Sequence, residues 1–233
     1  MDRKSISRTT IKYIAVFFMT INHICYAFYP SGYLGLISNG SAAMAFPLFQ
    51  MLLIEGYEKT SSKRKYFIRL LVMAIASQAP FYFYFRQPRL NVGFSLLVVF
   101  IICYVKEKCQ SQYIFTFTCI ILFAASFFLD NDFLVVIPTV ILLSQRIPLK
   151  FKYALCVIYG MIYRFAGLYV FSGAPLFNAV AVALMTPIPY ILYCFAYSSD
   201  KTGRKNSFTK HFFYIYYPLH LAVLYVSAIL YYL

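Results

Sequence analysis

Apolar runs alternate along the chain with short breaks that carry charge, proline or glycine. The first run reads "IKYIAVFFMTINHICYAFYP", at residues 11–30. Two of the runs, the fourth and the sixth, are short, because a helix that crosses a bilayer needs about 20 apolar residues. The pattern predicts an all-α bundle of about nine membrane helices in a single transmembrane domain, residues 1–233. The predicted spans are 11–29, 41–57, 66–85, 92–105, 113–129, 133–145, 152–170, 174–197 and 211–231.

The composition supports a membrane rather than a soluble protein. Hydrophobic residues make up 62% of the chain and charged residues only 12%, with a mean hydropathy of +0.71. A soluble domain is about a quarter charged, so the surplus apolar surface must face lipid. The first run is full length and lacks a small-residue cleavage site after it, so we expect it to stay as a helix rather than to be removed as a signal peptide.

The positive charge is distributed unevenly between alternate breaks. The net charge is +14, and eighteen of the 21 Lys and Arg residues fall in the amino terminus and in every second break. Intervening breaks hold only Arg86 and Arg89, together with the acids Asp130 and Asp132. Basic loops stay in the cytoplasm, so this pattern predicts a cytoplasmic amino terminus in a cell membrane. The charge therefore sets orientation, and we expect no nucleic-acid partner.

Six cysteines are scattered along the chain without a C-x-x-C pair. Several lie inside apolar runs, where a cysteine behaves as a small hydrophobic residue. The spacing predicts neither a disulfide framework nor a metal site.

Three polar side chains fall at similar depth in different predicted spans. His23, Arg164 and His220 each lie 10 to 12 residues beyond a lysine at the predicted cytoplasmic end of their span. At 1.5 Å per residue this places them about 15–18 Å along the helix axis. Ionisable groups at membrane depth are costly and usually functional. The three therefore predict a shared polar cavity near the middle of the bilayer.

Lys12 and His23 also share one face of the first span. Eleven residues at about 100° each leave the two side chains roughly 20° apart. A cation at the cytoplasmic mouth then lies in line with an imidazole deep inside. This arrangement suits a long anionic cofactor such as coenzyme A, whose phosphates Lys63, Arg64 and Lys65 of the next basic loop would attract.

Simpler interpretations of these residues stay open. A membrane histidine such as His23 can serve only as an interhelical hydrogen-bonding group, and Lys12 can be an ordinary interfacial anchor. Arg164 can be a structural ion-pair partner. Glu55 can pair with Lys12 or Lys59, or work in the cavity.

Four blocks of the sequence carry a family resemblance. They read "IKYIAVFFMTINHI", "AFPLFQMLLIEGYEKTSSKRKYFIRLLVMAIASQAPFYF", "LNVGFSLLVV" and "FFYIYYPLHLAVL". In order, they resemble successive blocks of the TraX family, over residues 11–105 and 205–231. The family is associated with bacterial conjugation and the inner membrane, and its founding member is linked to N-terminal acetylation of pilin.

The resemblance implies an acyltransferase. TraX-like proteins are similar to the wider group of transmembrane acyltransferases, whose first span carries a basic residue, ten residues and then a histidine. It implies acetyl transfer from cytoplasmic acetyl-CoA to an amine or hydroxyl of a peptide, a pilin or an envelope glycan. By this match His23 is the catalytic histidine, Lys12 contacts the CoA phosphates and His220 is a second active-site group.

Two positions depart from the family pattern. Asn22 replaces the usual Asp before the first-span histidine, and Ala43 replaces an Arg two residues before the "AFP" block. An Asp would orient the imidazole and stabilise its cation, whereas Asn can only orient it. Both changes remove charge, so a different substrate or a non-catalytic relative stays open.

Three functions are therefore compatible with the sequence. In the leading one, His23 accepts the acceptor's proton or carries the acyl group, and His220 or Arg164 stabilises the oxyanion. The second is a proton-coupled transporter, which also uses buried His and Arg. The third is a non-enzymatic assembly factor that binds a small membrane peptide or pilin.

Overall fold

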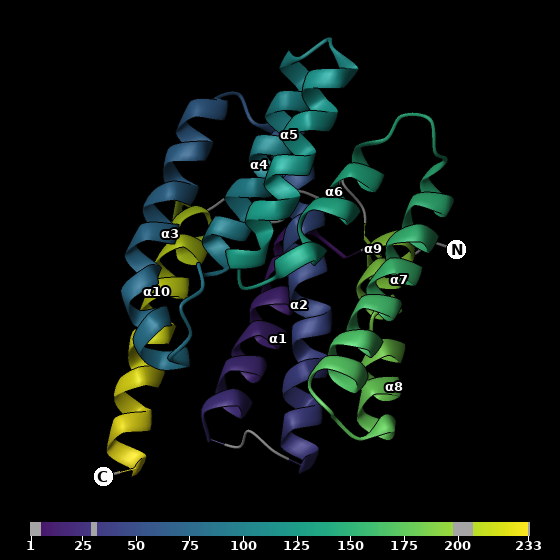
Figure 1. Cartoon of the computed structure of the whole chain (residues 1–233). Coiled ribbons are helices and arrows are strands. Elements are labelled where there is room, and N and C mark those ends of the chain that lie inside the picture. The colour runs from purple at the N-terminus through teal and green to yellow at the C-terminus, as the bar shows by residue number, and fades with distance from the viewer. Residues whose placement is uncertain (1–5, 29–31, 198–206, 233) are drawn as a thin grey trace. The chain divides into compact units, whose positions relative to one another are not determined.

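The structure is a computed structural model, and it describes residues 6–28, 32–197 and 207–232. Helices make up most of the described residues, and the β pairing among them is limited to two single-residue bridges. The all-α prediction is therefore confirmed (Figure 1). Arg3, Lys4, Lys201, Arg204 and Lys205, which entered the orientation argument, lie outside the described residues.

In the described part of the chain, ten α-helices follow the apolar runs in chain order. Two short 3₁₀ turns, η1 (Ser126–Phe128) and η2 (Asp132–Leu134), connect α5 to α6, and a π-helical segment, η3 (Ala166–Phe171), extends α7. The α-helices are α1 (Arg8–Phe28), α2 (Gly32–Lys59), α3 (Lys63–Phe85), α4 (Val92–Lys108), α5 (Gln112–Ala125), α6 (Val136–Leu143), α7 (Leu149–Phe165), α8 (Leu176–Met185), α9 (Pro187–Phe195) and α10 (Ser207–Tyr232).

Two helix boundaries differ from the sequence prediction. Helix α2 begins at Gly32 rather than at residue 41, because the polar segment around Ser38 continues the helix although its hydropathy is low. The predicted span 174–197 is divided at Thr186 into α8 and α9. Pro187 has no amide hydrogen to continue the ladder of α8, but it fits the first turn of a new helix.

Among the described residues, five helical segments are long and apolar enough to cross a membrane. They are Gly32–Lys59, Lys63–Phe85, Leu149–Phe171, Leu176–Phe195 and Phe212–Tyr231. The chain is thus a helical membrane protein. The full count of nine spans and the cytoplasmic amino terminus stay predictions.

The helices group into two compact units that are each built from distant parts of the sequence. The first unit comprises residues 1–49 and 153–210, and the second comprises residues 50–152 and 211–233. Whether they act as one domain stays a prediction.

Small residues allow close helix packing in the first unit. Gly40 of α2 lies against Met185, and a Cβ at this position would meet the Met185 sulfur, so that side chain would have to move. Gly160 of α7 is similarly close to Thr186, because a Cβ added to Gly160 would lie 2.8 Å from the Thr186 methyl group. Glycines of this kind are typical of membrane helix interfaces, where close approach of backbones replaces the hydrophobic effect.

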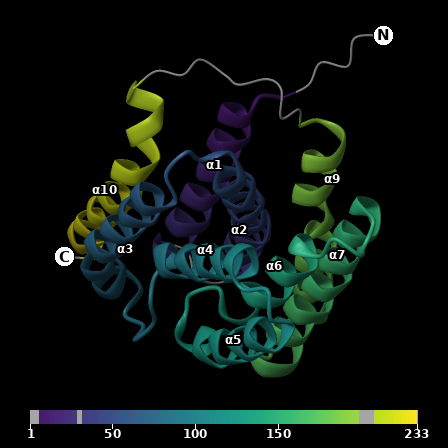
Figure 2. The same cartoon turned by 90° about the horizontal axis from the view of Figure 1, so that it is seen from above.

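Helix α4 is central to the second unit and contacts α3, α5 and α6 (Figure 2). Its first turn lies against α3, where a Cβ on Gly93 would meet Ala74 at 2.8 Å. Asn91 caps this turn by accepting from the Gly93 amide and also donates to the Ala74 carbonyl, both at 2.8 Å. The start of α4 is therefore fixed to α3 by both packing and hydrogen bonds.

Contacts join helix ends at two places in the second unit. At one end, the Tyr57 hydroxyl donates to Glu107 at 2.6 Å, which joins the ends of α2 and α4. At the other end, Leu90 bridges to Leu129 and Arg89 pairs with Asp132 at 2.8 Å. The loops assigned to the same membrane side thus lie together in this unit.

Candidate functional site

His23 lies on the buried face of α1. Ile11, Ala15, Met19 and His23 recur at every fourth position, and all four are buried. The His23 side chain is only 6% exposed. Residues four apart stack on one side of a helix, so this imidazole faces protein and not lipid.

Lys12 and His23 belong to one unbroken helix. Lys12 stands in the second turn of α1 and is half-buried. Because the helix is continuous between them, the rise of about 16 Å and the shared face expected from the sequence hold. A half-buried cation and a buried imidazole are therefore arranged along the same side of α1.

Asn22 fastens α1 to α2. Its amide nitrogen donates to both the carbonyl and the hydroxyl of Ser38, each at 3.0 Å, and the Ser38 hydroxyl donates back to the Asn22 carbonyl at 3.1 Å. Both amide hydrogens of Asn22 are thus used between the two helices. This packing role was not expected from the sequence, and an orienting role toward His23 stays a prediction.

Arg164 reaches the turn of α2 that precedes the "AFP" block. It stands in the last turn of α7, is half-buried, and its guanidinium lies 3.4 Å from the Ala42 carbonyl. Ala43, the next residue, is completely buried. In the part of the chain that the structure describes, no carboxylate pairs with Arg164. The groups near its charge are the Ala42 carbonyl and the side chains of Tyr163 and Tyr190.

His220 is buried in α10 between aromatic rings. Its ring stacks on Tyr216, with 5.0 Å between centroids and 6° between planes, and it lies 5.4 Å from the Tyr217 ring. Its Nδ1 is 3.0 Å from the Tyr216 carbonyl, which can only accept. Nδ1 therefore carries the proton in the neutral ring, and Nε2 is the basic nitrogen.

The predicted residues are divided between the two units. Lys12, Asn22, His23 and Arg164 belong to the first unit, and His220 belongs to the second. The shared cavity of His23, Arg164 and His220 stays a prediction.

Glu55 pairs with Lys59, at 2.6 Å across one helical turn. This pairing is one of the alternatives that the sequence left open. An acid neutralised in this way has little reason to contact a phosphate, although its assignment to the cofactor site stays a prediction.

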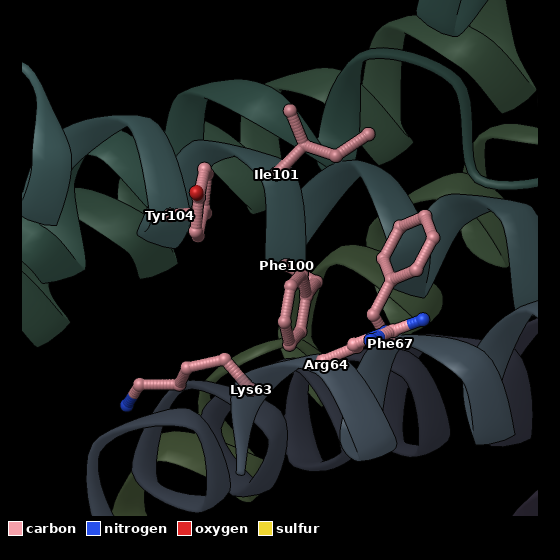
Figure 3. A pocket seen from close by; sticks show the side chains of 6 residues that line it. All are labelled: Lys63, Arg64, Phe67, Phe100, Ile101 and Tyr104. Carbon is pink, nitrogen blue, oxygen red and sulfur yellow. The ribbon is translucent and has the colours of Figure 1, made fainter.

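Two of the three basic residues expected to attract the donor line a groove. The groove lies between α3 and α4, measures about 290 Å³ and is formed by Lys63, Arg64, Phe67, Phe100, Ile101 and Tyr104 (Figure 3). Lys65 does not line it and is exposed.

A polar cluster that the sequence analysis did not single out lies at the other end of the second unit. Burial and the nearby Asp132 together raise the pKa of Asp130 to about 6, although Arg89 opposes both. The bridge between Leu90 and Leu129 holds this acid in place, since the Asp130 amide donates to the Leu90 carbonyl at 2.8 Å. In the sequence, only the string "DND" at residues 130–132 indicated this cluster, because the burial of Asp130 depends on the bridge between Leu90 and Leu129.

The long apolar helices identify the chain as a helical membrane protein. A comparison with protein families identifies its class more narrowly. The model of the family described as "TraX protein" matches residues 7–228. The chain therefore belongs to the TraX family, as its sequence blocks predicted. Comparison with curated proteins and with solved structures found no match.

Proposed function

We propose that this chain is an integral-membrane acyltransferase of the bacterial cell membrane. It transfers acetyl from cytoplasmic acetyl-CoA to an amine or hydroxyl of a peptide, a pilin or an envelope glycan. The observation that carries the proposal is the buried His23 in line with Lys12 on the unbroken helix α1 of a TraX-family chain.

In this proposal Lys12 binds the phosphates of the donor at the cytoplasmic mouth. A lysine there acts as a point charge on phosphate, and the donor's thin arm extends along α1 toward His23. Lys63, Arg64 and Lys65 raise the local concentration of the anionic donor through their field, which needs no direct contact.

His23 acts as the general base. The acceptor's nitrogen or oxygen attacks the thioester carbonyl carbon, and its proton passes to the imidazole. The carbon–sulfur bond then breaks, and the CoA thiolate leaves with the electron pair and takes up the proton. The variant in which His23 carries the acetyl group first has the same overall balance.

Positive and hydrogen-bonding groups would stabilise the oxyanion. Arg164 is suited to this role because a half-buried guanidinium without a carboxylate partner among the described residues keeps its charge available. It also lies beside Ala43, the position where the family pattern has an arginine. His220 is the second candidate for this role.

A transfer assay with labelled acetyl-CoA tests the proposal. Membranes that contain the chain should move label into a peptide or glycan fraction, and His23→Ala should lower the rate at least 100-fold. Met19→Ala, on the same buried stripe, is the matched control for lost packing and should retain activity. Equal transfer by wild type and His23→Ala would contradict the proposal.

A non-enzymatic assembly factor is the second candidate, and the position of Asn22 favours it. Its amide is used between α1 and α2 rather than in a charge-stabilising pair with His23. Capture of pilin by wild type and His23→Ala alike, without transfer of label, would select this function.

A further inference from the structure

We propose that the groove between α3 and α4 binds one anionic phospholipid. The headgroup phosphate lies at Arg64, and an acyl chain lies against Phe67, Phe100 and Ile101. This inference goes beyond the proposed acyl transfer and does not depend on it. The residues that carry it belong to the second unit and take no part in the chemical step, and Arg64 contributes to acyl transfer only through its long-range attraction of the donor.

The walls of the groove suit an acyl chain. Of the six side chains that line it, Phe67, Phe100 and Ile101 have no polar atom. Tyr104 presents an aromatic ring with one hydroxyl, and it is exposed. A groove of about 290 Å³ with such walls gains by covering methylene groups and offers few hydrogen bonds.

Arg64 is the cation available to a phosphate. It is exposed, and in the described part of the chain no carboxylate lies within salt-bridge distance of it. Lys63 is already engaged, because it donates to the Tyr57 carbonyl and lies 3.8 Å from Glu107. In Figure 3, Arg64 and Phe67 lie at one end of the groove and Lys63 at the other.

The predicted orientation places this groove at the lipid surface with the greatest anionic charge. Lys63 begins α3, and Tyr104 is one turn from the end of α4, at the end of the unit predicted to be cytoplasmic. Basic pockets between membrane helices on this side bind anionic headgroups. Arg64 can hold a phosphate through two parallel hydrogen bonds.

The same features make the groove a poor site for coenzyme A. That molecule brings an adenine, a ribose and two amides, and each of these polar groups loses free energy when it is buried without a hydrogen-bond partner. A phospholipid has one anionic headgroup and long apolar tails. One available cation above an apolar channel matches this distribution.

Native mass spectrometry of the purified full chain tests the proposal. The probe is an equimolar mixture of phosphatidylglycerol and phosphatidylcholine, followed by addition of CoA. We expect one retained phosphatidylglycerol per chain, at several-fold excess over phosphatidylcholine. Arg64→Gln should remove this preference, whereas Lys65→Gln, the adjacent exposed cation outside the groove, should keep it. Ile101→Trp should fill the channel and lower retention of both lipids.

Two results would overturn the proposal. Equal loss of preference in Arg64→Gln and Lys65→Gln would show a diffuse basic surface without a site. Displacement of phosphatidylglycerol from the wild type by CoA would assign the groove to the donor. If Ile101→Trp does not fold, the comparison of Arg64→Gln with Lys65→Gln still shows whether the groove binds the lipid specifically. An inactive chain in the acetyl-transfer assay would leave the lipid result unaffected.

Discussion

At the residue scale, Asn22 stands where the family pattern has an aspartate, and its contacts predict what that aspartate would do here. A carboxylate cannot donate to the Ser38 carbonyl, which Asn22 now reaches at 3.0 Å. Asn22→Asp would instead place a carboxylate oxygen beside the Ser38 carbonyl oxygen, and the two acceptors would repel each other. We expect it to lower the free energy of unfolding by about 1–3 kcal/mol, the cost of an unmet buried hydrogen bond.

The measurement is the apparent melting temperature in detergent, with Asn22→Ala as the comparison. Asn22→Asp should melt below Asn22→Ala, because alanine removes the donor without adding a charge. If Asn22→Asp is as stable as the wild type and more active, Asn22 is a weakened catalytic residue rather than a packing residue.

Asp130 predicts a pH dependence of stability. Its folded pKa of about 6 lies above the ordinary aspartate value of 3.8, so the folded state binds a proton more tightly than the unfolded chain. Stability therefore falls as pH rises from about 4 to 6 and stays lower above that. Asp130→Asn should raise the free energy of unfolding by about 1–2 kcal/mol at pH 7.5 and by little at pH 4.5.

Unfolding measured at both pH values checks this, with Asp132→Asn as the matched control. That variant loses the 2.8 Å ion pair with Arg89 and should be destabilised at pH 7.5. A gain from Asp130→Asn that is the same at both pH values would contradict the assignment of the raised pKa.

The sequence predicts some of these residue roles and misses others for a physical reason. The depth of His23 beyond Lys12 and the helix face that the two residues share lead to His23, because both are properties of one helix. The bond between Asn22 and Ser38 depends on the register of two helices, and the burial of Asp130 depends on a bridge between two loops. A local sequence pattern shows neither which helices pack side by side nor which loops form a bridge.

At the element scale, hydropathy finds the helices but misplaces the ends that polar residues occupy. Helix α2 extends through the segment around Ser38 because that serine is satisfied by α1. A hydropathy threshold treats such a segment as a loop. The break at Thr186 was readable in principle, since prolines at 187 and 189 cannot donate to the ladder of a preceding helix.

The interface between α3 and α4 gives a prediction about packing. A methyl group on Gly93 would meet the backbone of Ala74 at 2.8 Å, so the helices must separate to accept it. We expect Gly93→Ala to cost about 1–3 kcal/mol, as overpacked sites do. Gly167→Ala is the control, because a Cβ added at Gly167 would have no neighbour within 4 Å. Thermal unfolding should rank the two, and equal melting temperatures would contradict the close contact.

At the scale of the whole molecule, the chain builds each compact unit from two segments that are distant in the sequence, with residues 50–152 between those of the first unit and residues 153–210 between those of the second. Helix periodicity and charge alternation predict the number of apolar runs and the membrane side of each loop. They do not tell which distant runs pack together, because that depends on shape and small-residue contacts such as Gly40 against Met185. The family and the helical class were therefore predictable, whereas the grouping of helices was not.

The central claim is that acetyl-CoA lies along α1, with its phosphates at Lys12 and its thioester at His23. The most direct measurement is an experimental structure of the chain with a non-reactive acetyl-CoA analogue. The account predicts density that begins beside Lys12 and ends within hydrogen-bond distance of the His23 ring. Donor density that lies away from α1, in a chain that binds the analogue, would contradict it.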